Sequence, residues 1–131
     1  DIAKRILARA GSSERALLSV LVGWCFDGKV IRRLGPGAFR PEPKIKSAFV
    51  HLQPHEPPVC TAHKQHRRAV VQGGFAHRRK TLLNSLRQSG WQRDEIERAF
   101  ATIGIDIGAR AETLEVIQFA RLAEELPELI Q

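Results

Sequence analysis

The sequence changes character at a proline-containing stretch near its middle, and this change restricts the possible folds more than any other feature. Pro54, Pro57 and Pro58 interrupt this part of the chain, and proline offers no N–H to a helix or an inner strand. From about residue 63 onward, apolar residues recur at intervals of three and four, which indicates amphipathic helices. We therefore expect an α/β segment over residues 1–54, a linker over 55–62 and a small all-α domain over 63–131.

The α/β segment contains two expected helices. The first is short and ends at Gly11, and the second covers about residues 14–26 with Ser12 or Ser13 as its N-cap. The second helix is apolar on nearly every side. We therefore expect it to be buried, with Cys25 as a buried thiol.

Two strands are expected after these helices. Asp27-Gly28 indicates a turn, and residues 29–34 and 45–52 have the composition of strands. A sheet of two strands is marginal by itself, and the chain opens at Asp1 directly on a helical pattern. We expect a segment upstream of Asp1 to complete the sheet, or a second copy of the chain to pair with its exposed edge.

Four helices are expected in the all-α domain, at about residues 65–74, 79–89, 93–103 and 113–125. Thr113 is the expected N-cap of the last one. We expect Trp91 to pack among these helices. The residues expected to face the core from the last two helices are Ile96, Ala99, Phe100, Ile103, Leu114, Ile117, Phe119, Ala120 and Leu122.

The charge is strongly positive and unevenly distributed. The net charge is +7, which favours a polyanionic partner. Residues 51–90 carry seven Lys or Arg and one acidic residue, whereas residues 91–131 carry four against nine. There is no run of 18 or more apolar residues. We expect a cytoplasmic protein that uses no membrane as a partner.

Three consecutive cations, Arg78-Arg79-Lys80, precede the leucines of the helix expected at 79–89. Cations fixed next to a packed helix suit a phosphate backbone, because their position and charge are set in advance. Arg67, Arg68 and Lys64 could extend the same basic stripe. The alternative is a solvated face beside a core helix, which explains most single charge runs.

Other chemistry finds little support in the sequence. The two cysteines and five histidines lack the spacing of a metal site, so we expect no metal. His63 and His66 are expected to be solvated and to face phosphate. No serine has a nucleophile setting, and Glu112 and Glu115 are not placed for paired-carboxylate catalysis.

Several segments follow one another in a specific order. They are Leu18-Ser19-Val20, residues 37–50 (Gly-Ala-Phe-Arg-Pro-Glu-Pro-Lys-Ile-Lys-Ser-Ala-Phe-Val), residues 75–86 around Arg78-Arg79-Lys80-Thr81, Gly104-Ile105-Asp106 and Arg110-Ala111-Glu112-Thr113-Leu114. This set resembles the C-terminal half of the small-subunit rRNA adenine N6,N6-dimethyltransferases of the KsgA/Dim type. The resemblance covers about residues 1–126.

The resemblance implies an S-adenosylmethionine-dependent enzyme that dimethylates two adjacent adenines in a hairpin near the 3′ end of small-subunit rRNA. The implied fold is a Rossmann-like methyltransferase domain followed by a helical rRNA-binding domain. The implied partner is the small ribosomal subunit. The family's glycine-rich cofactor turn and its Asn/Asp-Leu/Ile-Pro-Tyr/Phe catalytic motif do not occur in this sequence. We therefore expect no catalytic or cofactor-binding residue in this chain, and RNA binding without activity.

Within the resemblance, Phe39 would lie beside the pocket for the target adenine. Stacking on an aromatic ring offsets part of the cost of extruding a base. Arg40 and Lys44 flank Phe39 and would hold neighbouring phosphates; the alternative is that Phe39 only covers the core. The other RNA-binding residues that the resemblance implies are Arg78, Arg79 and Lys80, with two of the three touching phosphate, together with Arg67 and Arg68.

Two other functions remain open. One is a macrolide-resistance type methyltransferase that acts on large-subunit rRNA. The other is a non-enzymatic basic module that binds nucleic acid, with the helices at 93–103 and 113–125 as a helix-turn-helix. The acidity of these two helices is unfavourable for insertion into a DNA groove.

Overall fold

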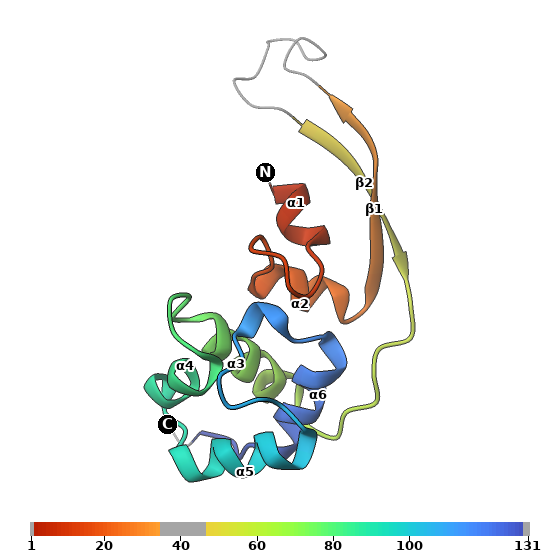
Figure 1. Cartoon of the computed structure of the whole chain (residues 1–131). Helices are drawn as coiled ribbons and strands as arrows, with labels where there is room; N and C mark the ends of the chain where they lie inside the picture. The colour runs from red at the N-terminus through yellow and green to blue at the C-terminus, as the bar shows by residue number, and fades with distance from the viewer. Residues whose placement is uncertain (1, 35–46, 130–131) are drawn as a thin grey trace.

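The computed structural model describes residues 2–34 and 47–129. The helices are α1 (Ile2–Leu7), α2 (Leu17–Gly23), α3 (Lys64–Phe75), α4 (Leu82–Ser89), α5 (Arg93–Ile103) and α6 (Val116–Glu125). A short 3-10 helix, η2, covers Ala111–Thr113, and the strands are β1 (Phe26–Leu34) and β2 (Ser47–Pro54). The strands form a ribbon beside α1 and α2, and α3 to α6 gather at the opposite end of the molecule (Figure 1).

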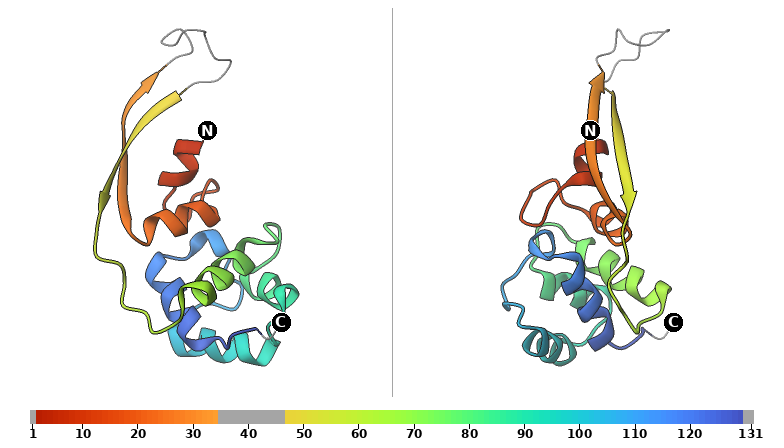
Figure 2. Two further views of the ribbon diagram at one scale, coloured as in Figure 1. Left: turned by 180° about the vertical axis from the view of Figure 1, so that it is seen from behind. Right: turned by 90° about the vertical axis from the view of Figure 1, so that its right-hand side faces the viewer.

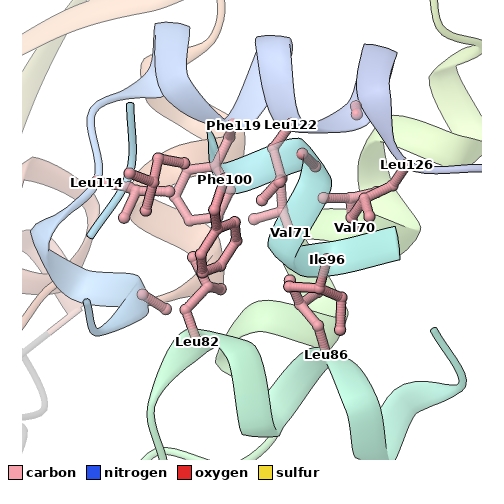
Figure 3. Close-up of a cluster of buried hydrophobic side chains, with 14 of the residues drawn as sticks. Val70, Val71, Leu82, Leu86, Ile96, Phe100, Leu114, Phe119, Leu122 and Leu126 are labelled. Carbon is pink, nitrogen blue, oxygen red and sulfur yellow. The ribbon is translucent and has the colours of Figure 1, made fainter. Parts of the chain in front are cut away.

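One hydrophobic cluster holds the helices together. Leu82 from α4, Phe100 from α5 and Phe119 from α6 point into it and are almost fully buried (Figure 3). Val20 and Trp24, from α2 and the residue after it, belong to the same cluster. The N-terminal segment is thus packed directly onto the later helices.

The ribbon is an antiparallel pair in which Phe26 lies opposite Pro54 and Leu34 opposite Ser47. The end of the ribbon at Phe26 and Pro54 lies against α1 and α2. The other end extends away from the helices in both views of Figure 2. Gly28 has a specific role in this packing. A β-carbon there would lie 2.5 Å from Cδ2 of Leu7 and 2.8 Å from Cδ2 of Leu52, so a side chain would force both leucines to move.

The proline-containing linker is fastened along α6. The Glu124 carboxylate accepts hydrogen bonds from the Thr61 backbone N–H at 3.0 Å and from Arg121 at 2.6 Å. These bonds, the one from the Thr61 N–H first, lower the pKa of Glu124. Arg121 also donates to the carbonyl of Val59 at 3.1 Å. The linker therefore has a fixed path from β2 to α3.

The N-terminal elements differ from the sequence expectation in three ways. The second helix is shorter than residues 14–26, because Ala16 is its N-cap and the chain leaves the helix after Gly23. Cys25 is exposed, so its expected burial is wrong. Asp27-Gly28 is not a turn, because both residues pair with β2 inside β1.

The last expected helix is divided in two. Thr113 is not its N-cap, because the Thr113 hydroxyl donates to the carbonyl of Arg110 at 2.6 Å within η2. Glu115 is the N-cap of α6, and its backbone N–H donates to the side chain of Gln118 at 2.8 Å. Ile117 was expected in the core but is 44% exposed, because it lies on the outer side of α6.

Candidate nucleic-acid interface

The cation triplet lies in the turn between α3 and α4, and not on α4 as the sequence predicted. The helix begins at Leu82 because Thr81 is its N-cap: the Thr81 hydroxyl accepts a hydrogen bond from the backbone N–H of Asn84 at 3.3 Å. Arg78, Arg79 and Lys80 therefore precede the helix. Their position depends on what holds the turn.

Arg110 holds the backbone of this turn. Its guanidinium donates to the carbonyl of Arg79 at 3.3 Å and to the carbonyl of Arg78, and it pairs with Glu112 at 3.0 Å. The backbone after the turn is bonded to the same loop, because the N–H of Leu82 donates to the carbonyl of Ala109 at 2.8 Å. The turn is thus anchored to the loop before η2.

Ser85 anchors the other side of the turn. Its fully buried hydroxyl donates to the carbonyl of Gly73 at 2.6 Å and accepts from the backbone N–H of His77 at 3.2 Å. The absence of a side chain at Gly73 lets α3 lie close to Trp91 and Ser89, because a β-carbon there would lie 2.9 Å from the Trp91 ring and 3.2 Å from the Ser89 side chain. A β-carbon at Gly74 would likewise lie 2.9 Å from Cδ1 of Leu82, so both glycines serve helix packing.

We expect Ser85→Ala to loosen the turn while leaving the fold intact. The His77 N–H would lose its acceptor, which costs about 1–2 kcal/mol of unfolding free energy. Hydrogen exchange at the amides of His77 and Lys80 should accelerate more than exchange in α5. Ser89→Ala is the matched control, because the Ser89 hydroxyl donates to the Ser85 carbonyl of its own helix at 3.0 Å and reaches the Gly73 carbonyl only at 3.4 Å, but makes no bond to the His77 N–H. Equal acceleration in both variants would contradict the role given to Ser85.

The three cations of the triplet differ in what their side chains contact. The Arg78 guanidinium donates to the carbonyl of Ser13 at 2.9 Å and so links the turn to the segment before α2. The side chains of Arg79 and Lys80 are exposed and form no hydrogen bond or ion pair within residues 2–34 and 47–129. Of the triplet, Arg79 and Lys80 are therefore available to a ligand.

No acidic residue competes for these cations along the chain, since no Asp or Glu occurs between Glu56 and Asp94. The situation on α5 and α6 is different. There the exposed cations pair within their helices, as Arg93 does with Glu97 at 2.6 Å and Arg121 with Glu124 at 2.6 Å.

The earlier basic residues lie on α3. The Arg67 guanidinium is 5.4 Å from the centre of the Trp24 ring, and this cation–π contact joins α3 to the segment after α2. Arg68 and Lys64 are exposed. Phe39, Arg40 and Lys44, the three predicted residues around the adenine pocket, lie outside the described residues.

His66 is buried, so its expected solvent-facing position is wrong. Its Nε2 lies 3.0 Å from the carbonyl of Ala123 and 2.8 Å from that of Leu126, where it caps the end of α6. In the part of the chain that the structure describes, no group of three His, Cys, Asp or Glu is placed to hold a metal ion. None of the described helices has the length and apolar character required to cross a membrane.

Comparisons with known proteins identify the family of this chain. The family model described as ribosomal RNA adenine dimethylase matches residues 1–128. The chain belongs to this family. Within the ribosomal RNA adenine dimethylase family, the chain is 40% identical over 125 residues to ribosomal RNA small subunit methyltransferase A of Syntrophotalea carbinolica, covering 95% of the chain and 47% of that protein.

A second relative, the protein of the same name from Gluconobacter oxydans, is 40% identical over 128 residues. The match covers 95% of the chain and 39% of that protein. The chain thus spans about half or less of the length of these curated relatives of the dimethylase family.

Two solved structures share the fold. A dimethyladenosine transferase from Plasmodium falciparum superposes with a TM-score of 0.72 at 19% identity, covering 92% of this chain and 52% of that one. The 23S rRNA methyltransferase ErmE superposes with a TM-score of 0.60 at 25% identity, covering 95% and 50%. The two-stranded sheet and six helices of the described residues are thus consistent with part of an rRNA methyltransferase.

Sequence reasoning found the cations but missed the residues that position them. Arg110 belongs to a family-like segment, yet its role depends on carbonyls more than 30 positions earlier. Ser85 looked like an ordinary helical serine. The only local signal was Gly73-Gly74, which is typical of a close approach between backbones.

Proposed function

We propose that this chain is the rRNA-gripping C-terminal part of an S-adenosylmethionine-dependent methyltransferase. The whole enzyme would dimethylate N6 of two adjacent adenines in a hairpin at the 3′ end of small-subunit rRNA. Family membership supports the reaction class. The observation that carries the role of this part is the turn at residues 76–81, which Arg110 and Ser85 anchor. It presents the side chains of Arg79 and Lys80 without partners among the described residues.

The proposed division of labour follows the sequence. Residues 1–54 would be the end of the methyltransferase domain, 55–62 the linker and 63–131 the helical rRNA-binding domain. Phe39, Arg40 and Lys44 would serve the adenine pocket of the whole enzyme. The protein would act in the cytoplasm on the small ribosomal subunit.

The described residues do not fit S-adenosylmethionine. Their one connection from a strand to a helix, residues 55–63 between β2 and α3, contains no glycine. A nucleotide-type cofactor requires a glycine-rich turn at such a place, so that the backbone can approach the ligand. We therefore propose that this chain alone binds RNA and transfers no methyl group.

The likeness to ErmE supports one alternative, a methyltransferase of the macrolide-resistance type that acts on large-subunit rRNA. Competition between small-subunit and large-subunit hairpins for the same chain distinguishes the two.

A third proposal concerns assembly. Each strand of the described two-stranded sheet has one edge without a partner, which a second copy could cover. Sedimentation analysis at increasing concentration tests it.

The proposed grip predicts a salt-dependent loss of binding. In Arg79→Ala/Lys80→Ala, we expect RNA affinity to fall roughly 10- to 100-fold at about 0.1 M salt, because two phosphate contacts are lost. The slope of log K against log salt should become shallower by about 1.4–1.8, which corresponds to two fewer released counterions. Titration of a labelled small-subunit rRNA hairpin at several salt concentrations measures both.

The matched control is Arg93→Ala/Arg98→Ala, which also removes two positive charges, but from α5. Both arginines are exposed and paired within the helix, Arg93 with Glu97 at 2.6 Å and Arg98 with Asp94 at 3.5 Å. We expect this variant to bind RNA as the unchanged chain does. An equal loss in both variants would mean that net charge alone drives binding, and the proposed grip would then be wrong.

A further inference from the structure

The outer side of α4 forms an open groove of about 350 Å³ lined by only four residues. They are two cations and two amides: Lys80, Asn84, Arg87 and Gln88. All four side chains are exposed. The groove continues from the anchored turn onto the helix, so Lys80 belongs to both.

The register of α4 explains why these side chains share one side. Leu82, Leu83, Ser85 and Leu86 are buried, which fixes the opposite side toward solvent. Arg87 and Gln88 come three and four positions after Asn84, so each stands next to Asn84 on that solvent side. Asn84 and Gln88 are about 6 Å apart along the helix axis.

In the described part of the chain, the polar groups of these four side chains are left to solvent. None of them forms a hydrogen bond or an ion pair with the residues that the structure describes. On α5 and α6, by contrast, exposed polar side chains pair with one another, as Arg98 does with Asp94 at 3.5 Å. The α4 groove therefore offers donors and acceptors to a ligand without first breaking internal contacts.

The combination of side chains restricts the ligand. Lys80 and Arg87 supply positive charge for phosphate, which RNA and DNA present alike. Asn84 and Gln88 each carry a donor and an acceptor, and this matches a hydroxyl group, which both donates and accepts. The 2′-hydroxyl is the group that distinguishes RNA from DNA, and A-form RNA displays it in a wide, shallow minor groove.

We propose that the α4 groove selects RNA over DNA, with Asn84 and Gln88 bound to ribose 2′-hydroxyls while Lys80 and Arg87 hold the adjacent phosphates. This inference rests on the proposed rRNA-binding function and adds a residue-level basis for choosing RNA. The eight residues of α4 span about 12 Å, which suits a face laid into a shallow groove.

The test compares an RNA hairpin with a DNA hairpin of the same sequence, each titrated against the whole chain. In Asn84→Ala/Gln88→Ala, we expect RNA affinity to fall about tenfold while DNA affinity and the salt slope for RNA stay unchanged. In Lys80→Ala/Arg87→Ala, affinity for both nucleic acids should fall and the slope should become shallower by about 1.4–1.8. Alanine is a good helix former, so both variants should keep α4.

Gln53→Ala is the matched control, because Gln53 is an exposed amide on β2. It should leave the preference for RNA unchanged. If the unchanged chain binds no RNA, the proposed function and this inference both fail. If it binds RNA but Asn84→Ala/Gln88→Ala weakens RNA and DNA equally, or weakens neither, the α4 groove does not read the 2′-hydroxyl. In that case the grip by Arg79 and Lys80 stands without it.

Discussion

Replacing Phe119 by alanine is expected to remove about 3–5 kcal/mol of unfolding free energy, the usual cost of truncating a buried phenylalanine. Phe119 is fully buried on α6, and its ring stacks on Phe75 with 5.7 Å between the ring centres. Small domains have a total stability of about 5–15 kcal/mol, so the midpoint of urea unfolding should fall steeply. Fluorescence of the two buried tryptophans, Trp24 and Trp91, follows this transition.

The control is Ile117→Ala, two residues earlier on the same helix. Ile117 is 44% exposed, so its removal leaves little cavity, and we expect a change of about 0.5–1 kcal/mol. A comparable loss in both variants would mean that burial in the cluster around Phe119 does not decide the cost, because alanine is a better helix former than either residue and cannot weaken α6 through propensity. The pair therefore tests whether the cluster around Phe119 holds the helices together.

The helices with strong periodicity and clear end signals could be predicted closely. Residues 93–103 were expected as a helix and are α5. The helix ends at Gly104, which has a φ of +87° and so adopts the left-handed conformation of a helix C-cap. Residues 65–74 were expected and α3 covers Lys64–Phe75. In both cases the local sequence contains the information.

Elements whose limits depend on distant contacts could not be predicted. Cys25 lies in an apolar run that resembles a helix, but the chain leaves the helix there to enter β1. Asp27-Gly28 is a typical turn sequence, yet Gly28 pairs with Leu52 inside the ribbon and leaves room for the Leu7 side chain. Both facts depend on the ribbon, whose second strand comes about 20 residues later in the chain.

The candidate interface shows the same division. The cation triplet and its basic surroundings are visible in the sequence. The start of α4 at Leu82 is set by the Thr81 N-cap, a signal that the run of leucines obscured. The anchor at Arg110 is a long-range contact to backbone carbonyls, and no local pattern contains such a contact.

Arg15 is the most distant of these hidden anchors. It is 5% exposed, its Nε donates to the carbonyl of Leu114 at 3.1 Å, and its Nη1 donates to the carbonyl of Ala8 at 3.0 Å. It therefore joins the residue after α1 to the connection between η2 and α6. Burial lowers the pKa of Arg15, and the nearby Glu115 carboxylate opposes this shift. Its Nη2 is buried without a partner among the described residues.

Two opposing effects decide the outcome of Arg15→Met. Methionine fills most of the volume and removes a desolvated charge with an unpartnered Nη2, which is favourable. It also leaves the carbonyls of Ala8 and Leu114 without their donors, at about 1–3 kcal/mol each. We expect the second effect to prevail, with a net loss of about 2–4 kcal/mol in urea unfolding and faster hydrogen exchange in α1 than in α5.

Arg9→Met is the control, because Arg9 is exposed in the same segment and should change stability by less than about 0.5 kcal/mol. An Arg15→Met chain as stable as the unchanged one would show that the buried charge costs as much as its two hydrogen bonds contribute, and that α1 is held by apolar packing instead.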